Sequence, residues 1–88
     1  MGLNELRKRL DAIDEQMMSL LSERAQVVMR VAIFKRQHNL PVYIPEREAS
    51  IIERLQAMNP GPLSGDTLGR IYRTIIEEMR RFENEYRE

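Results

Sequence analysis

Three basic residues on or beside one apolar helical stripe are the part of this sequence best suited to chemistry. Arg24 occupies a stripe position where an apolar residue is expected, and Arg7 and Lys35 flank the stripe near its two ends. Burying a cation is costly unless an anion meets it. A helix that carries several such cations is therefore expected to face an anionic molecule.

Arg24 and Lys35 share one face of the expected helix. They are 11 residues apart, which puts them about 20° from eclipsed and about 16 Å apart along the axis. Two long side chains at this separation can grip one small molecule. Arg7 precedes Arg24 by 17 residues, or about 25 Å on the same rod, so it cannot reach that molecule. In an antiparallel dimer that crosses near Met17 and Met18, each site would be completed by the partner's Arg7.

Two shorter expected helices add charged residues to the same site. Arg47 and Glu48 each precede an inward-facing position by four residues, and Glu83 follows the inner stripe of the last helix by four. The expected pocket contains Arg7 from the partner, Arg24, Lys35, Arg47, Glu48 and Glu83. Its four cations suit a small dianion, because arginine binds carboxylates with a two-pronged fork. The alternative is structural, with Arg24 in an ion pair with a glutamate of the last helix.

An unbroken helical pattern from Leu3 to about Asn39 positions the first cations. Its stripe advances in alternating steps of three and four, which is typical of a helix packed along one seam. The stripe is Leu3, Leu6, Leu10, Ile13, Met17, Leu20, Arg24, Val27, Val31 and Phe34. A rod of roughly 55 Å results, whereas a compact domain of this size has a radius of gyration of only about 12 Å. The seam therefore needs a second chain, most simply in a twofold dimer.

Two shorter helices are expected to follow. Pro45 suits the first turn of a helix that runs to about Met58. The residues expected on its buried face are Ile51, Ile52, Leu55 and Met58. Asn59-Pro60-Gly61-Pro62 is a firm break, and Ser64 is the expected N-cap of the last helix. We therefore expect one all-α domain over residues 1–88, with one very long and two shorter helices per chain, in an intertwined antiparallel homodimer.

Composition argues against several classes of function. Lys plus Arg and Asp plus Glu are both 14, so the chain lacks the basic excess of a nucleic-acid or membrane-surface binder. There is no cysteine, which excludes thiol chemistry and favours a cytoplasmic location. No signal region and no membrane-spanning run is present. No metal-ligand spacing, nucleophile–base pair or phosphate loop occurs, so we expect neither a metal nor a cofactor.

The sequence resembles the all-helical (AroQ) class of chorismate mutase, including the mutase domains fused to prephenate dehydratase. The likeness runs from Leu3 to Glu83. Its matching segments are Leu6-Arg7…Leu10-Asp11…Ile13-Asp14, Leu20-Leu21-Ser22-Glu23-Arg24, Lys35, Pro41-Val42-Tyr43…Pro45-Glu46-Arg47-Glu48, and Asn59-Pro60-Gly61-Pro62-Leu63-Ser64 leading to Ile71-Tyr72…Ile75-Ile76. Each fragment alone is a weak signal, but the ordered set at matching spacing is specific.

The resemblance implies an intertwined dimer that converts chorismate to prephenate in phenylalanine and tyrosine biosynthesis. This Claisen rearrangement is unimolecular and needs no nucleophile, general base or cofactor. The protein holds the reactive conformer and stabilises charge in the transition state. By resemblance, Arg7 of the partner subunit, Arg24 and Arg47 clamp the two carboxylates. Lys35 meets the ether oxygen, and Glu48 accepts a hydrogen bond from the ring hydroxyl.

Three positions depart from the family pattern. The position of Glu83 is often Gln, which donates to the ether oxygen, so Glu83 must carry a proton to do the same. Activity is then expected to fall as the pH rises through neutrality. Ile44 replaces an Asp that some members place near the hydroxyl, and Met79 replaces a small polar residue. Each of these two changes can weaken binding without changing the reaction.

Two other functions are alternatives. Isochorismate-pyruvate lyase uses a similar pocket, although the intact linker and the Asn59–Ser64 segment favour the mutase. A non-catalytic helical dimer module that regulates a partner enzyme would use Arg24 and Lys35 only as structural residues. Turnover of chorismate to prephenate separates the mutase from both alternatives.

Overall fold

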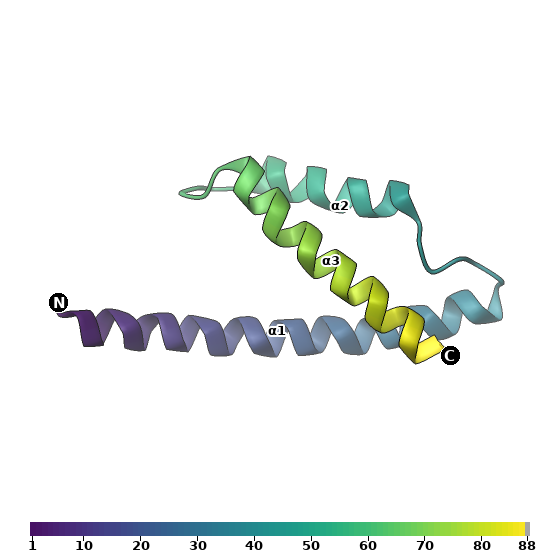
Figure 1. Ribbon diagram of the computed structural model, residues 1–88, viewed down its shortest axis with the longest axis horizontal. Helices are drawn as coiled ribbons and strands as arrows, with labels where there is room; N and C mark the ends of the chain where they lie inside the picture. The colour runs from purple at the N-terminus through teal and green to yellow at the C-terminus, as the bar shows by residue number, and fades with distance from the viewer. Residues whose placement is uncertain (88) are drawn as a thin grey trace.

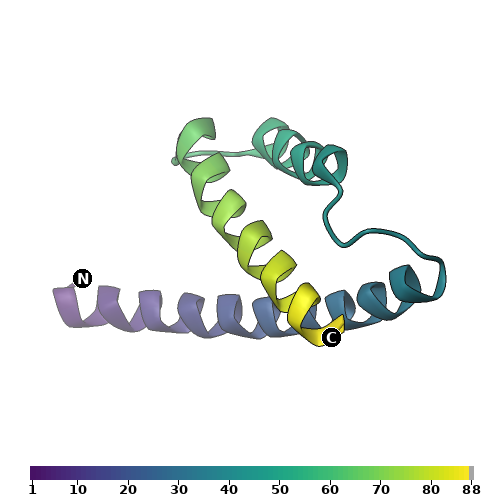
Figure 2. The same ribbon diagram turned by 45° about the vertical axis from the view of Figure 1, so that its right-hand side comes forward.

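The fold is all-helical, as predicted. The computed structural model describes residues 1–87. Its helices are α1 (Leu3–Gln37), α2 (Pro45–Met58) and α3 (Gly65–Arg87), and this range contains no strand. Figures 1 and 2 show α3 crossing obliquely between α1 and α2. Within the same range α3 packs on both of the other helices, whereas α1 and α2 do not pack on each other.

Helix α1 ends in a turn that fixes the position of Lys35. The helix stops at Gln37, two residues before the expected end at Asn39. Asn39 adopts a left-handed conformation, with φ of 55°. Its N–H donates to the Arg36 carbonyl at 3.4 Å, and the next N–H, of Leu40, donates to the Lys35 carbonyl at 2.8 Å. These two bonds form a Schellman motif, which satisfies carbonyls of the last turn and reverses the chain direction.

The core is small, and α3 lies at its centre. Each helix contributes one buried apolar side chain, namely Ala32, Ile51 and Ile76. At Gly69 a Cβ would lie 2.7 Å from the Gln56 Nε2 atom, so the end of this flexible side chain occupies the space that a larger residue would need. Helix α3 is thus held to α2 near its start and to α1 farther along (Figure 1).

The predicted bounds of α2 are confirmed, but part of its predicted buried face is wrong. Ile51 is buried, and Ile52 and Leu55 are half-buried. Met58 is 66% exposed. It is the last residue of α2, where the chain leaves the helix for the Asn59–Ser64 loop. The Ser64 cap is confirmed, since its Oγ accepts a hydrogen bond from the Thr67 N–H at 3.1 Å.

Most of the apolar stripe of α1 is exposed in the single chain. Every residue from 1 to 23 is exposed. The exposed stripe residues are Leu3, Leu6, Leu10, Ile13, Met17, Leu20, Val27, Val31 and Phe34. The chain measures 54 × 24 × 16 Å and has a radius of gyration of 16.0 Å, against about 12 Å for a compact domain of this length. A continuous apolar row of this size favours burial against another chain. No helix in the described range is long and apolar enough to cross a membrane.

Candidate active site

A cavity of about 320 Å³ lies where the second half of α1, the start of α2 and the second half of α3 come together. Its charged lining residues are Arg24, Lys35, Arg47, Glu48, Arg80 and Glu83. The remaining lining residues are apolar: valines, isoleucines and Met79. A volume of this order suits a small molecule, and apolar walls with a few polar groups are typical of ligand sites. Four cationic and two anionic side chains leave two positive charges in excess, as a dianion requires.

The cavity contains five of the six site residues predicted from the sequence. The five are Arg24, Lys35, Arg47, Glu48 and Glu83. Arg7 is exposed and does not line the cavity of its own chain. Ile44 and Met79, the two apolar departures from the family pattern, both line the cavity. The predicted separation of Arg7 from the other five is therefore confirmed for the single chain.

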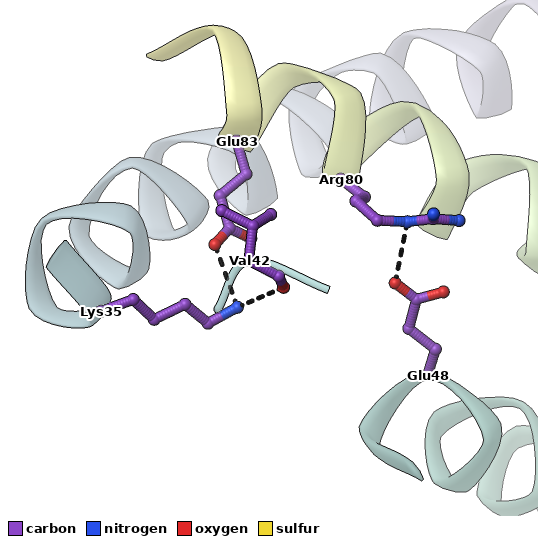
Figure 3. Close-up of polar contacts among 5 residues, drawn as sticks. All are labelled: Lys35, Val42, Glu48, Arg80 and Glu83. Atoms are coloured by element: carbon purple, nitrogen blue, oxygen red, sulfur yellow. Dashed lines mark hydrogen bonds and ion pairs between the residues drawn. The ribbon is translucent and has the colours of Figure 1, made fainter. Parts of the chain in front are cut away.

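Lys35 joins the end of α1 to both α3 and the α1–α2 connector (Figure 3). Its Nζ atom lies 3.0 Å from Glu83 Oε2, and the two side chains are only 13% and 9% exposed. The same Nζ donates to the Val42 carbonyl at 2.8 Å. An ammonium group has three donors, so one can still be directed at a ligand. Glu83 Oε2 has no aligned hydrogen bond despite the short ion pair.

Glu48 forms a second charged pair across the cavity, with a residue that the sequence did not identify. Arg80 Nε lies 3.1 Å from Glu48 Oε2 (Figure 3). The Arg80 guanidinium carbon also lies 4.3 Å from the centre of the Tyr43 ring. Its spacing could have indicated Arg80, because Arg80 follows the buried Ile76 by four residues. The prediction of Glu83 rests on the same spacing, since Glu83 follows Met79 of the inner stripe by four residues.

Arg24 and Arg47 are the cations of the cavity that make no ion pair among the described residues. Arg24 is half-buried and Arg47 is exposed. Within the described residues neither guanidinium group makes an ion pair, since the pairs join Lys35 to Glu83, Arg80 to Glu48 and Arg81 to Glu78. The structural alternative for Arg24, a pair with a glutamate of α3, is therefore not supported. The described residues also contain no group of three or more metal-ligating side chains.

Comparison with known proteins gives one consistent family. The model of the type II chorismate mutase family matches residues 6–84. A bifunctional chorismate mutase/prephenate dehydratase of Aquifex aeolicus is 42% identical over 78 residues, which are 84% of this chain and 22% of that protein. The chain thus spans about a fifth of the length of the first curated relatives it matches.

Solved structures of similar length share the same fold. A chorismate mutase (form II) from Thermus thermophilus superposes with a TM-score of 0.91 at 30% identity, over 93% of each chain. The chorismate mutase from Helicobacter pylori, solved in complex with prephenate, gives a TM-score of 0.88 at 30% identity, over 96% of this chain and 91% of that one.

Proposed function

This chain belongs to the type II chorismate mutase family, and we propose that it converts chorismate to prephenate in a site completed by a second copy of the chain. The observation that carries this proposal is the cavity of about 320 Å³, which gathers Arg24, Lys35, Arg47, Glu48 and Glu83. Arg24 and Arg47, together with Arg7 of the partner subunit, supply two-pronged donors for the two carboxylates of chorismate. We also propose that residues 1–88 form a single domain. A cytoplasmic location for the protein stays a prediction.

The proposed reaction places few chemical demands on the protein. In the Claisen rearrangement the ether C–O bond breaks as a new C–C bond forms, and no group is gained or lost. The rate then depends on holding the substrate in its reactive conformer and on stabilising charge that develops in the transition state. Side chains that are fixed before the substrate arrives suit both tasks, because they need little reorganisation during the reaction.

Three arginines are assigned to the carboxylates. Arg24 and Arg47 line the cavity without a protein anion as partner among the described residues, so each is free to bind a carboxylate. The third is Arg7 of the partner subunit. Lys35 is assigned to the ether oxygen, which gains negative charge as its bond breaks. The contact of Lys35 with the Val42 carbonyl at 2.8 Å favours this role by fixing the ammonium group.

The two carboxylates of the cavity have different proposed roles. Glu48 accepts a hydrogen bond from the ring hydroxyl. Glu83 donates to the ether oxygen, and for this it must be protonated in the substrate complex. The ion pair of 3.0 Å between Lys35 and Glu83 must therefore rearrange when the substrate binds. Both groups would then face the same oxygen.

The second chain is proposed from the exposed stripe of α1. Leu6, Leu10 and Ile13 are 43%, 58% and 50% exposed, which is costly for a rod that remains alone in water. An antiparallel partner crossing near Met17 would cover the stripe. The same crossing would bring Arg7 of the partner subunit to the cavity. Within one chain, Arg7 and Arg24 are separated by about 25 Å along α1.

Replacement of Arg24 tests the proposed function. Arg24→Ala is expected to lower kcat/KM for chorismate about 10²–10³-fold, the usual cost of removing one preorganised donor. Arg30→Ala is the matched control, because Arg30 is an exposed arginine of α1 outside the cavity. Circular dichroism and sedimentation should give the same helicity and dimer for both variants.

The possible results separate the enzyme from an interaction module. Loss of turnover in Arg24→Ala, with the helices and the dimer intact, would reject a structural role for Arg24. If the wild-type protein does not turn over chorismate at any pH, the proposed enzymatic function is wrong. Equal activity of the Arg24→Ala and Arg30→Ala variants would reject the assigned role of Arg24.

A further inference from the structure

We propose that Arg80 is a positioning residue that holds Glu48 for recognition of the substrate's ring hydroxyl, and so sets the preference for substrates that carry this hydroxyl. This inference rests on the proposed function. Its basis is the contact between Arg80 Nε and Glu48 Oε2 at 3.1 Å, which joins α3 to α2 beside the cavity. The two side chains are 31% and 21% exposed, so water screens this pair less than it screens a surface pair.

Tyr43 fixes the other side of the Arg80 guanidinium group. The guanidinium carbon lies 4.3 Å above the centre of the Tyr43 ring, within the range of a favourable cation–π contact. Tyr43 belongs to the α1–α2 connector, and its neighbour Val42 accepts the hydrogen bond from Lys35. The connector is thus tied to both charged pairs of the cavity, and Arg80 is held between an aromatic ring and a carboxylate.

This arrangement leaves one oxygen of Glu48 available to a ligand. Oε2 forms an ion pair with Arg80 Nε whose N–H is not aligned for a hydrogen bond, and no ion pair involves Oε1 within the described residues. A carboxylate with one oxygen anchored presents the other in a defined direction, which a hydroxyl donor can meet. Figure 3 shows the Glu48 carboxylate facing Arg80, away from the Lys35–Glu83 pair.

The pairing also keeps Glu48 away from the cations needed for substrate. Glu48 shares the cavity with Arg24, Arg47 and Lys35. Without Arg80 its charge would be attracted to these groups and would compete with the carboxylates of the ligand. Ile44 provides no second acceptor from the connector, so recognition of the hydroxyl depends on Glu48, and the direction of Glu48 depends on Arg80.

The experiment compares two substrates: chorismate, and the analogue in which hydrogen replaces the ring hydroxyl. The variants are Arg80→Gln, which removes the charge, and Arg80→Lys, which keeps it. Arg81→Gln is the matched control, because Arg81 is the neighbouring arginine, is 70% exposed and pairs only with Glu78 among the described residues. The ratio of the kcat/KM values for the two substrates is measured for each protein.

Wild type is expected to prefer chorismate by roughly tenfold or more, the usual effect of a hydrogen bond to a charged group. Arg80→Gln should lose most of this preference through a higher KM for chorismate, with the analogue changed by less than about twofold. Arg80→Lys should keep part of the preference for chorismate, and Arg81→Gln should keep all of this preference. Tyr43→Leu, which keeps both charges but removes the ring, should reduce the preference in the same direction and serves if Arg80→Gln does not fold.

Three results would overturn the inference. The first is an equal loss with both substrates in Arg80→Gln, which is expected if Arg80 supports only the fold or binds a substrate carboxylate itself. The second is an Arg80→Gln variant with the same ratio of kcat/KM values as wild type. If Arg80→Gln does not fold, an unchanged ratio in both Arg80→Lys and Tyr43→Leu has the same meaning. The third is wild-type protein that does not turn over chorismate, which overturns the proposed function as well. Turnover by wild type with an unchanged ratio in the variants overturns the role of Arg80 alone.

Discussion

Complementation between two inactive variants would test whether Arg7 acts on the partner's cavity. One variant is Arg7→Ala and the other is Arg24→Ala. Along α1 the two positions are 17 residues apart, or about 25 Å, and Arg7 does not line its own cavity. Each variant alone therefore has two defective sites per dimer, by loss of a different arginine.

The size of the recovery follows from the twofold symmetry of the proposed dimer. In a mixed dimer, the chain with Arg7→Ala keeps its own Arg24 and receives an intact Arg7 from the partner subunit. The other cavity lacks both arginines. Random reassortment of equal amounts gives about half mixed dimers with one intact site each, so about one quarter of wild-type activity should return.

The assay is chorismate turnover after the two variants are unfolded together in urea and refolded as a mixture. Each variant refolded alone, and the two refolded separately and then combined on ice, are the controls. Recovery to about one quarter is the expected result. Activity of the mixture equal to the average of the two variants, with mixed dimers demonstrated by mass spectrometry, would refute the composite site.

Three further predictions concern single side chains. Lys35→Met should lower kcat about 10²–10³-fold, because it removes the cation assigned to the ether oxygen; a kcat within threefold of wild type would contradict this. Glu83→Gln should keep kcat within about threefold of wild type or raise it, because the amide can donate a hydrogen bond to the ether oxygen; a kcat more than tenfold lower would contradict the role assigned to Glu83. Gly69→Leu should destabilise the fold by about 1–3 kcal/mol in urea unfolding, because its side chain would push against Gln56; an unchanged midpoint would exclude close packing there.

The helices were predictable because local signals mark their ends. Pro45 begins α2, and the break after Met58 ends it, as the sequence indicated. Helix α1 ends at Gln37, two residues before the expected end at about Asn39. Asn39 is left-handed, and the Schellman motif makes the left-handed residue the second one after the helix, so the regular helix ends at Gln37.

The site was predictable where a charged residue interrupted or flanked an apolar pattern. Arg24 breaks the stripe of α1, and Lys35 lies in the last turn of that helix. Arg80 shares its four-residue spacing from an inner position with Glu83, but its importance depends on Tyr43 and Glu48 from two other segments. Periodicity within one helix places Arg80 on the inner side, whereas its partners are set by tertiary packing.

The exposure of Met58 has a similar cause. Its spacing places it on the same face as Ile51 and Leu55, but it is the last residue of α2 and is 66% exposed. Helical periodicity identifies which residues share a face, whereas burial also depends on what packs against each position of that face.

The most direct measurement of the central claim is identification of the product formed from chorismate. Wild-type protein is incubated with chorismate and, separately, with isochorismate, and loss of substrate absorbance is followed while the product is identified by NMR. The proposed function predicts prephenate from chorismate, with the rate reduced about 10²–10³-fold in Arg24→Ala. Pyruvate released from isochorismate without turnover of chorismate, or no product from either substrate, would contradict it.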